Sequence, residues 1–313
     1  MVEAVFENVY GTPPEDLVAV HADATQFSPL MPGAQCLAAV ANAAPASPAL
    51  LSGLALLAPP AAVERRYTIA RALRALRPGA RLLVLAPKNK GGSRIARDLQ
   101  ALGCAFDETA RHHHRICTTA GAGDDKAIAA ALEAGKAQYV EELGLWSQPG
   151  VFSWNRMDPG SALLLAHLPA LVGRGADFGC GIGVLARAVL ASPKVTHLTL
   201  IDIDRRAIAM ARRNVALVDE NRITLRWADT RTHNDFSGLD FIVMNPPFHE
   251  GGSEKQTLGQ SFIQRAALAL RAGGVCWLTA NRHLPYEAIL KPLFRRVTLI
   301  VETDGYKVYQ AHK

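Results

Sequence analysis

The segment FIVMNPPFHEGG, residues 241–252, places polar groups directly after a run of apolar residues. Asn245 offers a side-chain carbonyl oxygen, and the backbone carbonyl of Pro246 offers a second acceptor. The two successive prolines fix the backbone dihedral angles, so both acceptors are in place before any reaction begins. Together they can hold the hydrogens of a planar, conjugated amine and favour its attack on an electrophilic carbon. Phe248 adds a flat surface for a base, a contact worth about 1–3 kcal/mol.

His249 follows this segment and has several interpretations. It could accept the proton that an alkylated nitrogen releases, or hold a phosphate group of RNA, and a structural hydrogen bond explains it equally well. No strong general base is required, because the amine proton becomes acidic once the nitrogen is alkylated. An ordinary strand-to-loop turn is the alternative for the N-P-P-F segment as a whole.

A glycine-rich segment, DFGCGIGVL, lies upstream between a predicted strand and a predicted helix. It supplies Asp177 and three glycines, and the missing side chains let the backbone approach a ligand closely. Asp202 ends the next apolar run, where a carboxylate can bind both hydroxyls of a ribose. This arrangement indicates a nucleoside site that includes Gly179, Gly181 and Gly183.

The spacing of the glycines separates two classes of cofactor. Dinucleotide enzymes use G-x-G-x-x-G and place a pyrophosphate at the helix end, whereas this chain has G-x-G-x-G with Asp177 two residues ahead. An acid there repels pyrophosphate and suits the ammonium of an amino acid, which favours S-adenosylmethionine. Asp229, at the end of RWAD, would take the adenine amine, although a helix or turn cap explains it equally well. A nucleotide-dependent oxidoreductase is the alternative.

Strand and helix patterns alternate through the second half of the chain. Residues 205–217 form an amphipathic pattern with arginines on one side, and residues 262–274 predict a helix ended by two glycines. The turn sequence ETDGY, residues 302–306, predicts that the last two strands form a hairpin. Such alternation predicts a mostly parallel sheet covered on both faces.

The first half repeats part of this pattern. LALLAPPAAV (54–63), a helix and RPGARLLVLAPKNKGG (77–92) parallel FIVMNPPF, a helix and RAGGVCWLTANRH (271–283). Ala58 stands where the second half has Asn245, and no acid-glycine loop precedes it. The pattern predicts two copies of one fold, the first degenerate, although chance similarity of two α/β halves is the alternative. We expect the boundary within the Pro- and Gly-rich residues 147–161.

Several segments together resemble the ribosomal RNA small subunit methyltransferase C family: QPGVFS, DPGS, DFGCGIGVL, NPPFHEG, LPY and YKVYQA, across residues 148–313. The resemblance implies a cytoplasmic class I S-adenosylmethionine-dependent methyltransferase that methylates the exocyclic amine of a guanine in 16S ribosomal RNA. It implies an α/β fold of two tandem Rossmann-like domains: residues 1–147 degenerate, and residues 148–313 catalytic around a seven-stranded, mostly parallel sheet.

The same resemblance assigns roles to individual residues. It implies that Phe152 and Ser153 close over the cofactor. It also implies that the target base lies beside Asn245, Pro246 and Phe248. The cofactor would be lined by Asp177, Gly179, Gly181, Asp202 and Asp229. The final Phe-His separates the segment from N-P-P-Y methyltransferases of adenine or protein glutamine, which stay as alternatives together with a guanine of 23S ribosomal RNA. A further alternative is a non-enzymatic RNA-binding assembly protein with a vestigial pocket.

The charge distribution bears on the partner. The net charge is +6, and residues 65–97 contain ten Lys or Arg and no acid. Lys88, Lys90 and Arg94 end a predicted strand in the degenerate half, which suggests a clamp for RNA phosphates; a solvated helix face is the alternative. We expect a monomer that acts on ribosomal RNA, either free or within the 30S subunit. The five scattered cysteines predict neither a structural zinc site nor a disulfide framework, and the acidic, polar N-terminus predicts no signal peptide. The most apolar run, residues 49–63, is short and broken by two prolines, so no membrane span is expected.

Overall fold

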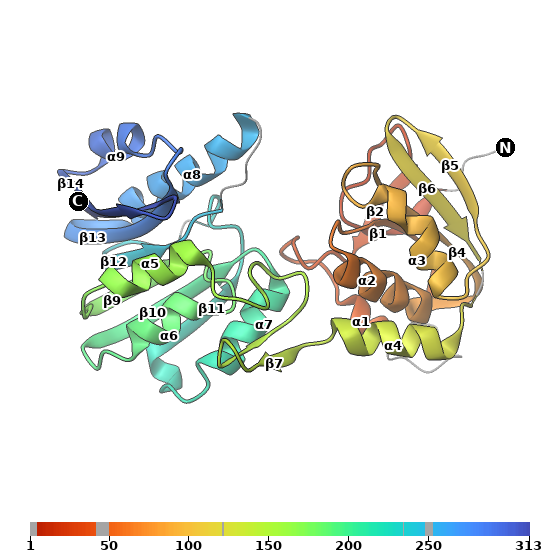
Figure 1. The fold of residues 1–313 in the computed structure, drawn as a ribbon, viewed down its shortest axis with the longest axis horizontal. Coiled ribbons are helices and arrows are strands. Elements are labelled where there is room, and N and C mark those ends of the chain that lie inside the picture. The colour runs from red at the N-terminus through yellow and green to blue at the C-terminus, as the bar shows by residue number, and fades with distance from the viewer. Residues whose placement is uncertain (1–4, 42–49, 121, 234, 248–252) are drawn as a thin grey trace. The chain divides into compact units, whose positions relative to one another are not determined.

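The computed structural model describes residues 5–41, 50–120, 122–233, 235–247 and 253–313. The chain divides into two compact units, Met1–Ala137 and Gln138–Lys313 (Figure 1). The contacts therefore group residues 138–147, which the sequence assigned to the first domain, with the second unit. These residues include a hairpin of β7 (Gln138–Val140) and β8 (Leu145–Ser147). Asn214 fastens it by bonding the backbone of Trp146, to which its amide nitrogen donates at 2.9 Å.

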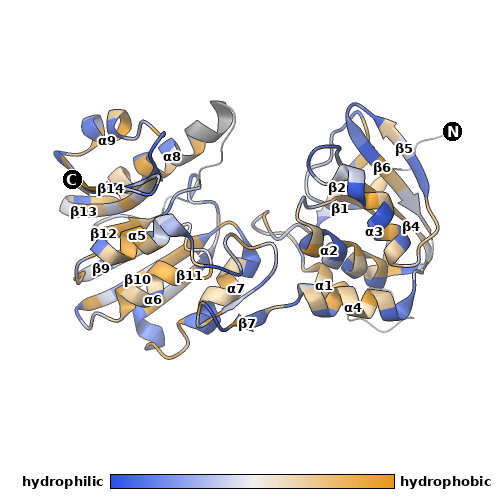
Figure 2. Cartoon of the chain, in the orientation of Figure 1, coloured by the Kyte–Doolittle hydropathy of each residue, from blue (hydrophilic) through white to orange (hydrophobic). Residues whose placement is uncertain are grey.

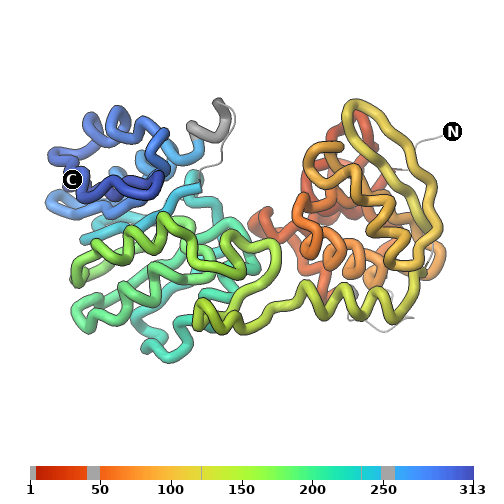
Figure 3. Tube along the Cα trace, in the orientation of Figure 1, coloured from red at the N-terminus to blue at the C-terminus, as the bar shows by residue number. Residues whose placement is uncertain are grey.

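The second unit is built on a seven-stranded sheet in the order β11-β10-β9-β12-β13-β15-β14. All neighbouring strands are parallel except β15, which runs antiparallel to both β13 and β14. The chain can be followed through these strands from green to blue in Figure 3. The predicted mostly parallel sheet and C-terminal hairpin are confirmed. The strands are β9 (Gly173–Phe178), β10 (Val195–Asp202), β11 (Ile223–Trp227), β12 (Leu239–Met244), β13 (Leu270–Asn281), β14 (Arg296–Thr303) and β15 (Tyr306–His312).

Helices cover both faces of this sheet because the central strands are apolar on both sides (Figure 2). On β12, Phe241 and Val243 belong to the core beneath α5, α6 and α7, whereas Ile242 and Met244 belong to the core beneath α8 and α9. Alternating side chains of a strand point to opposite faces, so one buried strand supports both layers. The helices are α5 (Pro159–His167), α6 (Val184–Leu190), α7 (Arg205–Asn214), α8 (Ser253–Ala269) and α9 (Glu287–Leu293), with a short 3₁₀ helix η2 (Glu220–Arg222).

One predicted helix end is wrong. Helix α8 ends at Ala269, before the two glycines that were expected to end it, and the chain enters β13 at Leu270. Gly273, with φ of +77°, lies where the register between β12 and β13 shifts. Glycine takes this left-handed conformation without strain, so here it marks an irregularity in the strand rather than a helix end.

The order of the second sheet reverses at β9, which has β10 on one side and β12 on the other. Connections leave such a point in opposite directions and open a crevice at the carboxyl ends of the strands, where ligands of open α/β sheets bind. In β12, Val243 and Met244 pair with Asp177 and Phe178 of β9. The glycine loop after β9 and Asn245 after β12 therefore leave the sheet at the same edge.

The first unit repeats this arrangement with one strand fewer. Its sheet has the order β2-β1-β3-β4-β6-β5, with β6 antiparallel to both neighbours and the other pairs parallel. Strand β3 lies between β1 and β4 as β12 lies between β9 and β13, and Ala58 follows β3 as Asn245 follows β12. The predicted degenerate copy is confirmed. The strands are β1 (Phe6–Tyr10), β2 (Val20–Gln26), β3 (Leu51–Leu57), β4 (Leu76–Pro87), β5 (Asp107–Arg111) and β6 (His114–Thr119).

The first unit differs most at the connection that carries the glycine loop in the second. Residues 11–19 join β1 to β2 without a helix, and a small core cluster lies against them through Leu17 and Val18. The main core of the described residues packs against four helices, and a 3₁₀ turn leads into the third of them. These are α1 (Leu37–Ala41), α2 (Ala62–Ala75), η1 (Gly92–Arg94), α3 (Ile95–Ala101) and α4 (Asp125–Gly135).

In the first unit, an arginine donates hydrogen bonds to the carbonyl oxygens of the double proline, Pro59 and Pro60. Arg65 of α2 is 2% exposed, and its Nη1 donates to the carbonyl oxygen of Pro60 at 2.7 Å and of Pro59 at 3.5 Å. Its Nε donates to the buried carboxylate of Asp98 at 2.6 Å. This arginine belongs to the basic block that the sequence suggested for phosphate binding, but it faces the interior. The corresponding carbonyl of Pro246 in the second unit was expected to accept from a substrate.

In the described part of the chain, none of the helices combines the length and hydrophobicity that a membrane crossing needs. All five cysteines are free.

Replacing Arg65 by Met should destabilise the first unit by about 3 kcal/mol, because Asp98 would stay buried without its closest cation. Arg66→Met is the matched control, since Arg66 is half exposed and lies 3.7 Å from the same carboxylate; it should cost less than about 1 kcal/mol. All four tryptophans lie after residue 137, so circular dichroism during urea unfolding reports both units and tryptophan fluorescence only the second. An unchanged circular dichroism transition in the Arg65 variant would contradict this account.

Candidate functional site

A pocket opens at the carboxyl edge of the second sheet. It brings together five residues that the sequence predicted for the site, from the segment before α5, the loop after β9 and the end of β12: Phe152, Ser153, Gly179, Gly181 and Asn245. Its other lining residues are Arg156, Asp158, Ser161, Cys180, Ile182, Val184 and Leu185. Phe152 is 59% exposed, and Ser153 has a φ of +48°, which is strained for a residue with a side chain.

The three glycines of the loop have different reasons to be glycine. All have positive φ, +70° at Gly179, +53° at Gly181 and +86° at Gly183. A Cβ at Gly181 would meet no atom of the described residues within 4 Å, which leaves space beside it for a ligand. At Gly183, which precedes the first turn of α6, a Cβ would lie 3.4 Å from Ala211 of α7. Gly181 thus faces the pocket, and Gly183 allows the loop to turn into the helix.

Asp177 is a buried carboxylate without a counter-charge. Asp177 lies near the end of β9 and is fully buried, and it pairs with Leu200 of β10 on one side and with Val243 of β12 on the other. Neither of its carboxylate oxygens has a hydrogen-bond partner within the described residues. Burial, and then the charge of Asp202, raise its pKa to about 8. A cation bound in the adjacent pocket would favour the ionised form of this group.

Asp202 ties the glycine loop to the neighbouring strand. One carboxylate oxygen accepts the amide of Gly181 at 2.8 Å, and the other accepts the amide of Asp204 at 2.8 Å. Burial raises its pKa to about 6 in spite of these two bonds. The loop is therefore held by the residue that was predicted to bind the ribose, at the end of β10 beside the pocket.

Asp229 is engaged by its own turn. Its carboxylate accepts the amide of Arg231 at 2.9 Å and forms a two-pronged ion pair with the Arg231 guanidinium. Burial would raise the pKa of Asp229, but the hydrogen bonds from Arg231 outweigh it and the pKa is lowered. The turn cap that was weighed against adenine binding is present, and adenine binding by Asp229 stays a prediction.

The amide of Asn245 has a fixed orientation. Its Nδ2 donates to Oδ1 of Asp158 at 2.7 Å and to Oγ of Ser161 at 2.8 Å. An amide nitrogen carries two hydrogens, so both are used, and the side-chain oxygen is the atom left to accept from a substrate. The adjoining Pro246 is buried. Phe248 and His249 lie outside the described residues.

Two residues that hold Asn245 were missed as site residues. Asp158 and Ser161 begin α5 in the sequence D-P-G-S, which is typical of an N-cap followed by a first-turn proline. Oδ1 of Asp158 accepts the amide of Ser161 at 2.8 Å, as a helix cap does. The pattern announced a helix start, but nothing local indicated that this cap also contacts a side chain 87 positions away.

The residues of the pocket fit S-adenosylmethionine. A buried carboxylate without a partner suits a molecule with an ammonium and a sulfonium, the open side of Gly181 leaves room for it, and Asp202 stands at the strand end where ribose is expected. Within the described residues, no group of three or more His, Cys, Asp or Glu side chains is arranged to hold a metal ion.

Comparison with known proteins assigns the family. The Methyltransferase small domain model matches residues 142–310. Ribosomal RNA small subunit methyltransferase C of Shewanella sp. (strain W3-18-1) is 35% identical over 257 residues, which cover 78% of this chain and 71% of that protein. The chain is a member of the ribosomal RNA small subunit methyltransferase C family. The protein of the same description from Shewanella sp. (strain MR-4) is 39% identical over 161 residues, 51% of this chain and 46% of that protein.

A solved structure of this methyltransferase family extends the likeness to the whole chain. The 16S rRNA N2 methyltransferase of T. thermophilus, solved in complex with AdoMet and guanosine, has a TM-score of 0.77 and 25% sequence identity, and covers 100% of this chain and 90% of that chain. The likeness therefore includes the first unit, where the sequence resemblance was weakest.

Asp177→Asn should stabilise the methyltransferase without cofactor and weaken its binding of S-adenosylhomocysteine. The ordinary pKa of the carboxyl is 3.8, and in the folded protein it is about 8. The folded state therefore keeps a proton that the unfolded state loses, so native stability falls relative to the variant as pH rises from about 4 to about 8, and the difference is constant above. Urea unfolding at about pH 5 and pH 8 measures this difference. An equal difference at both pH values would contradict the unpartnered carboxylate.

Proposed function

We propose that this methyltransferase transfers a methyl group from S-adenosylmethionine to the exocyclic N2 amine of a guanine in 16S ribosomal RNA. The observation that carries the proposal is that Asn245 and the glycine loop line one pocket. A side-chain oxygen that can accept a hydrogen bond from an amine therefore lies beside the loop that would hold the cofactor. The Shewanella relatives are named ribosomal RNA small subunit methyltransferase C, and the solved relative is in complex with AdoMet and guanosine.

The residues of the pocket act mainly by orientation. Oδ1 of Asn245 and the backbone carbonyl of Pro246 accept the two hydrogens of the amine, which directs the nitrogen lone pair toward the cofactor side of the pocket. When bound, S-adenosylmethionine supplies a methyl group that passes to this lone pair, while the C–S electron pair stays on sulfur. The alkylated nitrogen then loses a proton to water or to His249. The sequence assigns stacking on the base to Phe248, which lies outside the described residues.

The same features count against the alternatives. A dinucleotide would place its pyrophosphate near Asp177, a buried carboxyl group that no described residue neutralises. An anion there would disfavour the ionised form of Asp177 and gain no charge pairing from it, whereas a cation favours that form. A vestigial pocket would have no reason to keep the Asn245 amide on two buried partners. Adenine and glutamine amines differ from guanine N2 in the groups around the nitrogen, so the product distinguishes them.

Asn245→Ala should reduce kcat by about 100-fold or more and leave S-adenosylhomocysteine affinity within about twofold, because the amide orients the amine and does not hold the cofactor. Methyl transfer from labelled S-adenosylmethionine is measured on 16S ribosomal RNA and on 30S subunits from a strain that lacks the enzyme. Digestion to nucleosides should give N2-methylguanosine. A methylated adenosine, or unchanged kcat in the variant, would contradict the proposal. We also propose that the active form is a monomer, which sedimentation tests.

We also propose that the first unit contacts RNA phosphates through the turn after β4. Lys88, Lys90 and Arg94 are exposed there, and none of them forms an ion pair with another described residue. Other members of the basic block have partners within the unit: Arg65 is buried, and Arg74 lies 3.0 Å from Asp125. Arg81 and Arg97 are exposed as well, and the turn gathers three exposed charges within residues 88–94.

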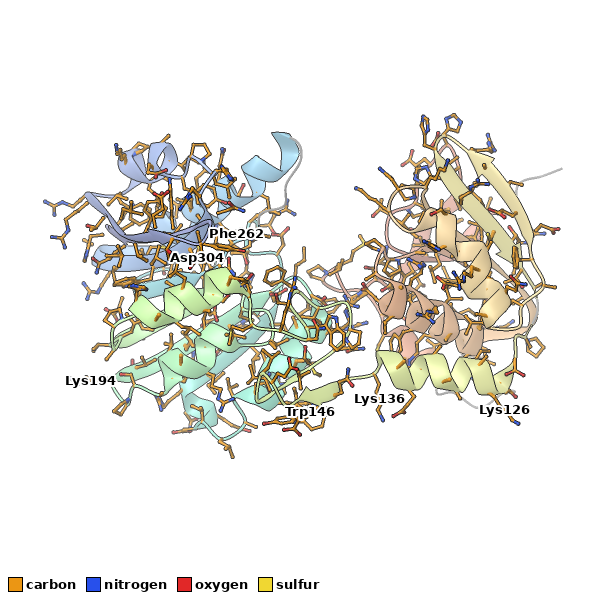
Figure 4. All side chains as sticks on the ribbon, viewed as in Figure 1. Lys126, Lys136, Trp146, Lys194, Phe262 and Asp304 are labelled. Atoms are coloured by element: carbon orange, nitrogen blue, oxygen red, sulfur yellow. The ribbon has the colours of Figure 1, made fainter. Side chains whose placement is uncertain are left out.

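Replacing Lys88, Lys90 and Arg94 by Gln should weaken RNA binding and lower the slope of log affinity against log salt by about 2 to 3, because each phosphate contact releases counterions. The matched control replaces Lys126, Lys136 and Lys194, exposed residues that point outward in Figure 4, and removes the same charge. Filter binding over a range of salt measures both variants, and S-adenosylhomocysteine affinity should stay native. Equal losses in the two triple variants would show a general charge effect and contradict a clamp.

A further inference from the structure

We infer that Asp158 and Ser161 are positioning residues for methyl transfer: they hold the Asn245 amide so that its oxygen, and not its nitrogen, meets the substrate amine. The inference rests on the proposed role of Asn245. An asparagine amide has nearly the same shape in its two orientations, but only one of them presents an acceptor. An enzyme that uses this oxygen must therefore exclude the other orientation.

The contacts at the start of α5 accomplish this. Oδ1 of Asp158 accepts from Asn245 at 2.7 Å and Oγ of Ser161 accepts at 2.8 Å, so both amide hydrogens point at α5. Asp158 and Ser161 are each 8% exposed, which leaves little water to compete. A hydrogen bond to a buried carboxylate is stronger than one between neutral groups. Rotating the amide by half a turn would set its oxygen against the Asp158 carboxylate, with no hydrogen between two acceptors.

The same contact explains why an amide stands at this position. A carboxylate at residue 245 would also offer an oxygen to the substrate. It would, however, place a second negative charge 2.7 Å from Asp158, and two buried carboxylates at that distance do not both stay ionised. The donor side of the residue is therefore as necessary as its acceptor side.

The anchor itself is rigid. Asp158 is the N-cap of α5, with extended backbone angles of φ −69° and ψ 129°, and Pro159 fixes the first helical position. Behind it, a Cβ at Gly160 would come within 2.9 Å of the Tyr306 ring in β15, so the helix end lies tight against the sheet. One atom of Asp158 therefore serves both the helix cap and the site, because its Oδ1 accepts hydrogen bonds from the backbone amide of Ser161 and from the side-chain amide of Asn245.

Two substitutions separate these functions. Ser161→Ala removes one acceptor of the Asn245 amide and leaves the cap intact. Asp158→Ser keeps a good N-cap, but its shorter side chain does not reach residue 245. We expect kcat to fall about tenfold or more in Asp158→Ser and by a smaller factor in Ser161→Ala, with KM for RNA and S-adenosylhomocysteine affinity unchanged. Asp158→Asn, which keeps an oxygen in place, should recover most of the loss.

The controls distinguish positioning from stability. Asp124 caps α4 of the first unit in the same way, accepting the amide of Ala127 at 2.8 Å, so Asp124→Ala should lower thermal stability and leave kcat native. A second readout needs no turnover. In a nitrogen-15 spectrum, the side-chain NH₂ pair of Asn245, assigned by its loss in Asn245→Ala, should exchange slowly with solvent in the native chain and faster in Asp158→Ser.

The outcomes are separable. If Asn245→Ala is inactive while Asp158→Ser and Ser161→Ala keep native kcat and slow exchange, the positioning inference is wrong and the role of Asn245 stands. If Asn245→Ala keeps native kcat, the proposed function of Asn245 fails, whatever the other variants do.

Discussion

The parallel pairing of β9 with β12 is the constraint on which the site depends. Register places Asp177 beside Val243 and Phe178 beside Met244, so the two strands end together and their connections leave in opposite directions. A glycine loop and an asparagine amide, far apart in the chain, thereby line one pocket. Three features of the site meet at this edge: the loop with the open side of Gly181, the buried carboxyl group of Asp177 near the end of β9, and the side-chain amide of Asn245.

The site also carries a free-energy cost that the fold must offset. Asp177 is buried without a partner, which raises its pKa to about 8. Such a group destabilises the protein without ligand and favours a cation in the pocket, so stability is exchanged for affinity at this residue. Asp202 holds the neighbouring glycine loop by accepting the amide of Gly181, and it accepts the amide of Asp204 through its other oxygen.

The two units show how one sheet order serves two purposes. In the second, residues after β12 hold an amide toward the pocket. In the first, Ala58 follows the equivalent strand. Arg65 donates a hydrogen bond to the carbonyl oxygen of Pro60 and forms an ion pair with Asp98. The first strand of each sheet along the chain shows the same contrast. Strand β9 is followed by the glycine loop and α6, whereas β1 is followed by residues 11–19, which contain no helix. The first unit keeps the strand order, but Ala58 stands in place of the amide and Arg65 donates to the carbonyl oxygens of the double proline.

The sequence by itself determined the features that depend on local residue types: the glycine loop, the N-P-P segment, the alternation of strands and helices and the duplicated pattern around Ala58. Backbone freedom, proline stiffness and apolar periodicity act over a few residues, so they can be recognised without coordinates. Only the tertiary structure decided which polar groups meet. It joined Asp158 to Asn245 across 87 positions, buried Arg65 instead of exposing it and ended α8 before its glycines. Hydrogen bonds and burial depend on distances between elements, and packing of the whole sheet sets those distances.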